Sequence, residues 1–153
     1  MVVDIPCKEW FPDRAPLGVP ISVATNVIPW VDGYKPFNAF SAISSNGLTA
    51  KFQGGIFARD VGNNVYIYAG DATKLYRLVV ATLTDATRLA GGAYTTASDG
   101  WWEFVQWGET VIGVNGFTDA PQKMTLGGAN FSALGGSPPN AKHIAIIRDF
   151  VVL

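Results

Sequence analysis

The chain has 153 residues, of which 48% are hydrophobic and 15% charged, and its formal net charge is −1. This length suits one ordinary domain, and a charged fraction below the usual ~25% indicates that partners cover part of the surface. The Lys and Arg residues are scattered, which argues against a basic stripe for direct nucleic-acid recognition. Cys7 is the only cysteine, so an intramolecular disulfide and a cysteine zinc site are excluded.

Targeting and membrane signals are also missing from the sequence pattern. Residues 1–6 lack the basic start and apolar run of a signal peptide. No segment approaches the ~20 apolar residues that a membrane-spanning helix needs. We therefore expect no membrane span, and we attribute the positive mean hydropathy to buried strands.

The first 45 residues are predicted to form an extended arm. This region holds six of the nine prolines, and proline removes a backbone donor and disfavours a central sheet position. The arm is also rich in aromatic residues: Trp10, Phe11, Trp30, Tyr34, Phe37 and Phe40. Two interpretations of these aromatics stay open, namely anchors on a partner surface or a small core of the arm itself.

Residues 46–153 carry the pattern of an all-β protein. Short runs rich in Val, Ile, Tyr, Phe and Trp alternate with Gly, Asn and Asp. We expect strands over 52–59, 65–69 and 74–78, a fourth strand near 87–90, and a tight turn at Asn63-Asn64. The best helical pattern, 84–90, is cut by Gly91-Gly92 and is interpreted as a strand or a single turn. The four Gly-Gly pairs, which include Gly54-Gly55, are interpreted as β-turns.

This strand pattern repeats. The run beginning at Val65 matches the run beginning at Val111, an offset of 46, and the same offset places Leu75-Tyr76 on Pro121-Gln122. A third copy begins at Asp149, which matches Glu109 at an offset of 40. A period of ~40–50 residues with about four short strands is typical of β-propeller blades. The sequence therefore predicts about two and a fraction four-stranded blades, with a β-sandwich as the alternative.

The last ten residues, 144–153, have the pattern of a core strand pair with no polar tail. An open sheet there would leave apolar surface and backbone donors in water. We expect this sheet to be completed either by further chain or by a neighbouring subunit.

Two stretches resemble structural proteins of tailed bacteriophages. The first comprises residues 9–13 and the pattern Asn-x-x-Pro-x-x-x-Gly-Tyr-x-Pro from Asn26 to Pro36, similar to the opening of tail-tip or tail-tube proteins. The second comprises residues 75–76, 102–109, 114–116, 121–122 and 148–152, similar to the blade sequence of the same proteins. The resemblance implies a virion tail component, made in the host cytoplasm, that forms a ring with copies of itself. It further implies an arm docked on an adjacent ring of tail or connector proteins.

No residue pattern predicts catalysis, a cofactor or a metal site. Asp71, Asp85, Asp99 and Asp119 lie at expected turns, where Asp commonly closes the loop. His143 is the only histidine, and no motif surrounds it, so we expect a structural role.

The densest aromatic group lies at residues 101–107. Strand alternation places Trp102 and Phe104 on one face, where we expect core packing, and Trp101 on the other. For Trp101, packing against an adjacent blade is favoured over an exposed position that would stack on a sugar or fill a neighbour's pocket.

The sequence thus predicts a non-enzymatic structural protein of a phage tail. The residues expected to bind partners are Trp10, Phe11, Trp30, Tyr34 and Phe37. The alternative is a carbohydrate-binding propeller module for host recognition, and a glycosidase fragment is the third choice.

Overall fold

The computed structural model of the chain describes residues 25–30 and 33–153. The chain divides into two units, Met1–Ser41 and Ala42–Leu153. The described residues contain strands and no helix, so the all-β prediction is confirmed. Within that part of the chain, accordingly, no helix is available to cross a bilayer.

The strands form four antiparallel sheets. One of them is a two-stranded hairpin, which consists of β1 (Val27–Trp30) and β2 (Gly33–Pro36). The other three are called the first, second and third sheets. The first sheet consists of β3 (Gly54–Arg59), β4 (Val65–Gly70), β5 (Leu75–Val79) and β6 (Thr82–Asp85). The second sheet consists of β7 (Glu103–Trp107), β8 (Thr110–Val114), β9 (Gln122–Thr125) and β10 (Ser132–Ala133). The third sheet consists of β11 (Ala145–Ile147) and β12 (Phe150–Val152).

The hairpin lies in the region where we expected an extended arm. Its register pairs Pro29 with Tyr34 and Val27 with Pro36. Proline fits here because each strand of a two-stranded sheet has a free edge, where a missing N–H breaks no ladder. Beyond the hairpin, the Phe37 N–H donates to the Asn26 carbonyl at 2.7 Å. The rest of the predicted arm before Thr25 lies outside the described residues.

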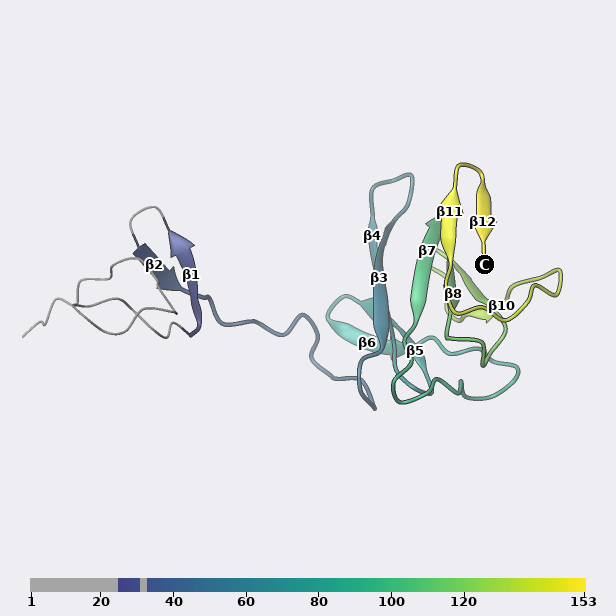
Figure 1. The fold of residues 1–153 in the computed structure, drawn as a ribbon, viewed down its shortest axis with the longest axis horizontal. Coiled ribbons are helices and arrows are strands. Elements are labelled where there is room, and N and C mark those ends of the chain that lie inside the picture. The colour runs from purple at the N-terminus through teal and green to yellow at the C-terminus, as the bar shows by residue number, and fades with distance from the viewer. Residues whose placement is uncertain (1–24, 31–32) are drawn as a thin grey trace, which may run out of the picture. The chain divides into compact units, whose positions relative to one another are not determined.

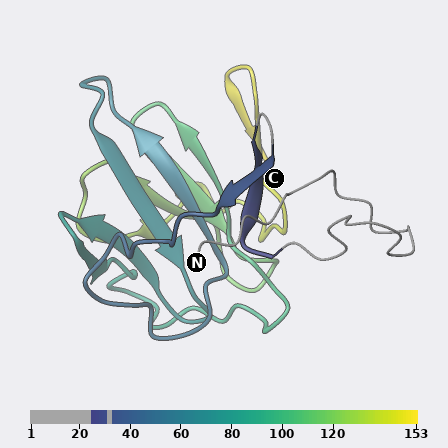
Figure 2. The same cartoon turned by 90° about the vertical axis from the view of Figure 1, so that its left-hand side faces the viewer.

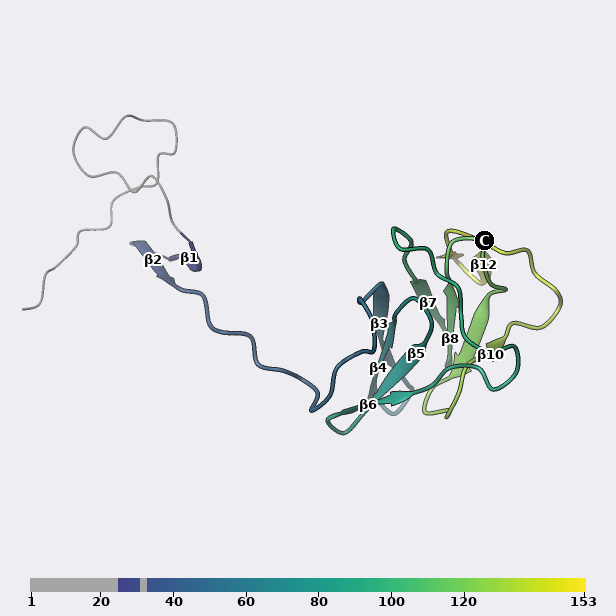
Figure 3. The ribbon, with the colours of Figure 1, turned by 90° about the horizontal axis from the view of Figure 1, so that it is seen from below.

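The three sheets of the second unit stand side by side. The first and second sheets are meanders in which each strand pairs with the next along the chain. Their leading strands, β3 and β7, contact each other, and β7 also contacts β11 (Figure 1). Figure 2 looks toward the first sheet, and Figure 3 shows the first and second sheets as adjacent layers. The second four-stranded sheet therefore follows the first along the chain and lies beside it in space.

Two sequence predictions are wrong in detail. The fourth strand is Thr82–Asp85 and not 87–90, because a turn at Val80, whose φ is 58°, returns the chain directly after β5. Gly54-Gly55 begin β3 instead of forming a turn, because the Trp102 backbone and side chain come too close to Gly54 to leave room for a Cβ. The turn predicted at Asn63 is confirmed by its φ of 64°.

The strand registers define which positions of the repeats are equivalent. Gly70 pairs with the first residue of β3, and Val114 pairs with the first residue of β7, which gives an offset of 44 in place of the predicted 46. One strand later Tyr76 and Gln122 are equivalent at the predicted offset of 46. The loop after β8 is therefore two residues longer than the loop after β4.

The third repeat begins as the sequence predicted. β12 starts 40 residues after β8, and both follow a two-residue turn. The first residue of that turn has a positive φ in both copies, 57° at Gly108 and 55° at Arg148. A positive φ suits Gly and costs energy at Arg, so Arg148 carries backbone strain.

The larger hydrophobic core lies between the first and second sheets. Tyr68 and Leu75 of the first sheet pack with Val111 and Met124 of the second, and all four are buried. Tyr68 also meets Phe131 edge-on, with 5.6 Å between the ring centroids. Burial of each such side chain contributes about 1.5–3 kcal/mol, so this interface holds the two sheets together.

A smaller core lies between the second and third sheets. It consists of Ile112, Val114, Ala141 and Ile144, with Val151 packed against it. Because Val111 faces the larger core and Ile112 the smaller one, the second sheet is buried on both faces. This explains why four consecutive residues of β8 are buried and apolar or Gly instead of alternating with polar residues.

Equivalent buried polar residues close the loops after β4 and β8. The Asp71 carboxylate accepts from the backbone N–H groups of Thr73 and Lys74, at 2.9 and 2.8 Å, and from the Tyr76 hydroxyl at 3.0 Å. At the equivalent position, the Asn115 side chain accepts from the Asp119 N–H at 3.1 Å. Both side chains are at most 2% exposed, so the loops are fixed from inside.

We predict that Gly54→Ala destabilises the second unit by about 1–3 kcal/mol, because a Cβ at Gly54 would overlap the Trp102 carbonyl oxygen and its φ is 148°. Gly47→Ala is the matched control, since nothing lies within 4 Å of its Cβ position. Urea denaturation of both variants measures the difference. Equal stability of Gly54→Ala and the unmodified chain would contradict this packing.

Asp71 makes folding stability sensitive to acid. Burial raises the pKa of Asp71, but hydrogen bonds from Thr73, Lys74, Thr49 and Tyr76 lower it more, so the net pKa lies below the usual value. Its contribution to stability is therefore present above the unfolded carboxyl pKa of about 4 and is lost as the pH falls through the lower folded pKa.

We accordingly predict that Asp71→Asn costs about 1–3 kcal/mol at neutral pH. The same variant should flatten the decline of the unfolding free energy between about pH 5 and pH 2. Urea unfolding at several pH values checks both. A decline as steep as that of the unmodified chain would remove Asp71 as its source.

Candidate assembly surfaces

The five residues predicted to bind partners all belong to the first unit. Trp10 and Phe11 lie outside the described residues. Trp30 ends β1 and Tyr34 lies in β2, so the backbone brings both into one hairpin. Phe37 follows β2, is 46% exposed, and lies 5.2 Å from the ring of Phe40, which is 90% exposed. The described part of the arm thus exposes an aromatic pair.

The junction of the first and second sheets shows how one repeat packs against the next. The second sheet presents Phe104, Val111 and Met124 to the face of the first sheet that carries Tyr68 and Leu75. At the rim of this junction, the Gln106 side chain pairs with the Arg59 backbone. Its Oε1 accepts from the Arg59 N–H at 2.9 Å and its Nε2 donates to the Arg59 carbonyl at 2.5 Å.

A second polar contact joins the same two sheets. The Glu109 carboxylate, in the β7–β8 turn, accepts from the Val61 N–H at 2.9 Å. Together with the Gln106 pairing it occupies backbone groups at an edge of β3 and in the following loop, which would otherwise be open to another strand. Glu109 therefore joins the β7–β8 turn of the second sheet to the loop after β3.

The opposite face of the first sheet is partly open. By strand alternation this outer face carries Phe57, Val65, Ile67 and Leu78, and it is equivalent to the face that the second sheet buries. Phe57 is 73% exposed and Val65 50% exposed. The first sheet thus presents, uncovered, the same kind of surface that builds the internal junction.

A strap from residues 45–49 contacts the Tyr76 end of this outer face and the edge strand β6. The Thr49 hydroxyl donates to Asp71 at 3.0 Å and lies 2.7 Å from the Tyr76 hydroxyl. The Asn46 side chain pairs with the backbone of Leu83 in the edge strand β6, at 2.8 and 2.9 Å. The strap therefore blocks strand addition at β6 while leaving the patch around Phe57 in contact with water.

The third sheet has a corresponding open face. One side of it packs on the second sheet through Val151. The other side carries Ile147, Phe150 and Val152, which are exposed, Phe150 by 72%. The sequence predicted this strand pair correctly. It also predicted a core position, but within residues 144–153 only Ile144 is buried.

These two apolar patches, around Phe57 on the first sheet and around Phe150 on the third, are the candidate assembly surfaces. Contiguous exposed apolar patches commonly mark interaction sites. The Phe57 patch was not predicted from the sequence, although Val65 to Tyr68 of β4 is apolar or aromatic on both faces. Such a run indicates a strand that is meant to be covered on both sides.

The carboxylates serve the loops of the fold. Asp119 forms an ion pair with Arg88 at 2.7 Å and accepts from the Thr95 N–H at 2.9 Å. Burial raises the pKa of Asp119, but hydrogen bonds from Thr95, Asn115 and Arg88 lower it more, so it lies below the usual range. Asp85 accepts from the Thr87 N–H at 2.9 Å. The turn roles predicted for Asp71, Asp85 and Asp119 are confirmed.

His143 and Trp101 lie close together on the surface. His143 Nδ1 is 2.9 Å from a Glu103 carboxylate oxygen, which ties the segment before β11 to β7. Trp101 is 42% exposed, with the Lys142 ammonium 5.0 Å from its ring centroid. The core position favoured for Trp101 is therefore wrong, whereas Trp102 and Phe104 are stacked at 5.8 Å in the core as predicted.

No protein-family model matches this chain, and no curated protein matches its sequence. Nor do the His, Cys, Asp and Glu residues within 25–30 and 33–153 form a cluster of three or more that would hold a metal ion.

We predict that Phe57→Thr combined with Phe150→Thr lowers the binding of a hydrophobic fluorescent dye, because both rings lie in the exposed patches. Since the two side chains are mostly exposed, the unfolding free energy should change by no more than about 0.5 kcal/mol per site. Val61→Thr is the control, being 97% exposed and outside both patches. Dye fluorescence that falls equally in the control would argue against patch-specific binding.

Proposed function

We propose that this protein is a structural, non-enzymatic component of a tailed-bacteriophage tail. In this role its sheets act as blades of a β-propeller, and its N-terminal arm contacts neighbouring subunits in a ring at the tail or the head-to-tail junction. The function is assembly, so its chemistry is that of apolar burial and backbone pairing at interfaces.

One observation carries this proposal. Equivalent sheets follow each other in register, and the outermost sheets expose the faces that the second sheet buries. A sheet buried on both faces is the stable unit of such a stack, as the second sheet is here. The exposed Phe57 and Phe150 patches then mark the faces that further blades or subunits cover.

The arm supports the same role. The hairpin that contains Trp30 and Tyr34 belongs to a unit distinct from the sheets, and the exposed Phe37–Phe40 pair follows it. Aromatic side chains are favoured as interface anchors because each buries a large area at low cost in side-chain entropy. The resemblance of residues 26–36 to the opening of phage tail proteins agrees with this reading.

A carbohydrate-binding module is the second candidate. The exposed Trp101, with Lys142 and His143 beside it, favours this candidate, because sugars stack on exposed aromatic rings beside hydrogen-bonding groups. The Lys142 ammonium, however, lies over the ring and competes for its face. A glycan array separates the two functions, since specific glycan binding lost in Trp101→Ala would favour host recognition over assembly alone.

Composition analysis of purified virions tests the proposal. Tailed particles from the host that carries the gene are purified on a density gradient, and their tryptic peptides are identified by mass spectrometry. Peptides of this chain at a constant ratio to a tail protein support the structural role. Their presence in the lysate but not in purified particles would contradict it.

We predict that Trp10→Ala combined with Trp30→Ala weakens ring formation while the sheets stay folded, because both changes lie in the arm unit. Size-exclusion chromatography with light scattering measures assembly, and urea denaturation measures folding. Val61→Ala serves as a surface control in the sheets. A double variant that assembles like the unmodified chain would refute the anchoring role of the arm.

A further inference from the structure

A slot opens inside the first sheet, between β4 and β5. The ladder between these strands ends at the pair Tyr68 and Arg77. β4 nevertheless extends to Val65 in its pairing with β3, and β5 extends to Val79 in its pairing with β6. The two strands therefore diverge, although each keeps its other neighbour.

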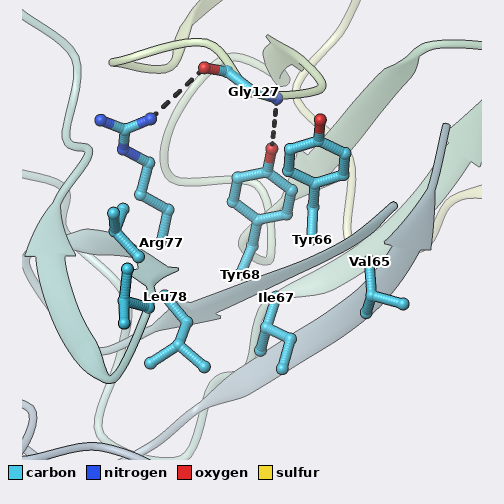
Figure 4. Close-up of a pocket in the computed structure, with 9 residues that line it drawn as sticks. Val65, Tyr66, Ile67, Tyr68, Arg77, Leu78 and Gly127 are labelled. Carbon is cyan, nitrogen blue, oxygen red and sulfur yellow. Dashed lines mark hydrogen bonds between the residues drawn. The ribbon is translucent and has the colours of Figure 1, made fainter. Parts of the chain in front are cut away.

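The slot is a pocket of about 270 Å³ with one polar side. Val65, Ile67, Leu78, Val79 and Val80 supply its apolar lining. Tyr66, Tyr68 and Arg77 extend from the other face of the sheet toward Gly127, in the loop after β9 (Figure 4). The lining is thus apolar with one cationic group, which is the usual character of a pocket for a small organic ligand.

Arg77 has spare donors at this place. One Nη donates to the carbonyls of Gly127 and Gly128, at 3.3 and 2.9 Å. Its Nε is buried and has no hydrogen-bond partner, and Arg77 takes part in none of the ion pairs found within 25–30 and 33–153. A guanidinium is always charged and fits a carboxylate with two parallel donors. A buried donor without a partner is costly, which favours an acceptor from outside the chain.

The hydroxyl groups of Tyr68 and Tyr66 make the two ends of the pocket chemically different. The Tyr68 hydroxyl accepts from the Gly127 N–H at 3.4 Å, so its own proton remains available to donate to a ligand. The Tyr66 hydroxyl donates to the Asp60 carboxylate at 3.1 Å. Because Asp60 repels an anion at the Tyr66 end, the negative group of a ligand belongs at the Arg77 end.

We propose that this slot binds a carboxylate carried on an apolar body, with the carboxylate at Arg77 and Tyr68 and the apolar body against Val65, Ile67 and Leu78. A free monocarboxylate and the C-terminal residue of a polypeptide share this chemistry. The apolar lining residues Val65, Ile67 and Leu78 also belong to the outer face that carries Phe57, so the slot shares this face with the proposed assembly surface.

Titration of the isotope-labelled full chain, followed by backbone amide NMR, tests the site. The probes are benzoate and benzamide, and an acetylated tripeptide ending in phenylalanine as the free acid and as the amide. We expect saturable shifts at the Gly127 and Tyr68 amides with the two acids, and affinities at least about tenfold weaker with the two amides. A tripeptide acid that binds more tightly than benzoate identifies a polypeptide C-terminus as the ligand, and equal affinities identify a free monocarboxylate.

Arg77→Gln should weaken benzoate binding at least about tenfold. Lys123→Gln removes the same charge from an exposed residue outside the pocket and should leave benzoate binding unchanged. Absence of saturable shifts with either acid overturns the proposal, as does equal binding of acid and amide. The comparison of acid with amide uses the unmodified chain, so it decides even if Arg77→Gln fails to fold.

Discussion

The position of Trp102 determines how the first two sheets fit together. Its N–H donates to the Gln53 carbonyl at 2.6 Å, and its indole Nε1 donates to the Asp71 carbonyl at 2.9 Å. The ring stacks on Phe104 and meets Tyr94 edge-on, with centroids 5.8 and 4.9 Å apart. Through its backbone N–H and its indole, this one residue joins the second sheet to the beginning of β3 and to the end of β4. Because interiors are close-packed, the backbone beside Trp102 must be glycine: a Cβ at Gly54 would meet the Trp102 backbone, and a Cβ at Gly70 would meet its ring.

This junction connects the fold to the proposed function. Since Trp102, Gln106 and Glu109 fix the second sheet on the first, the face carrying Phe57 is presented on a rigid layer instead of a mobile loop. The third sheet is held in turn through Ile144 and Val151, which leaves the Phe150 face outward. Interfaces built on rigid elements lose little entropy when they form. The same rigidity keeps β4 and β5 apart at the slot, because each strand is fixed by its other neighbour.

Buried polar side chains close the loops of the repeat. Asp71 and Asn115 occupy equivalent buried positions, although one is ionised and the other neutral. Each closes its loop by accepting backbone N–H groups, so the repeat conserves a geometry and not a charge. The carboxylates of Asp60, Asp85, Asp119 and Glu109 likewise accept hydrogen bonds from backbone N–H groups.

The sequence by itself determined the all-β class, the period of the repeat, the turn at Asn63 and the core positions of Trp102 and Phe104. These follow from local rules, namely strand alternation and turn chemistry. Only the tertiary structure decided the place of the fourth strand, the glycine pair at the start of β3, the exposure of Trp101 and the Phe57 patch. The fourth strand depends on the turn at Val80, where a residue other than glycine adopts a positive φ. The others depend on which residues of another sheet come close, and strand periodicity carries no information about that distance. The slot beside Arg77 belongs to the same class, since it exists only because two strands that are neighbours in sequence separate in space.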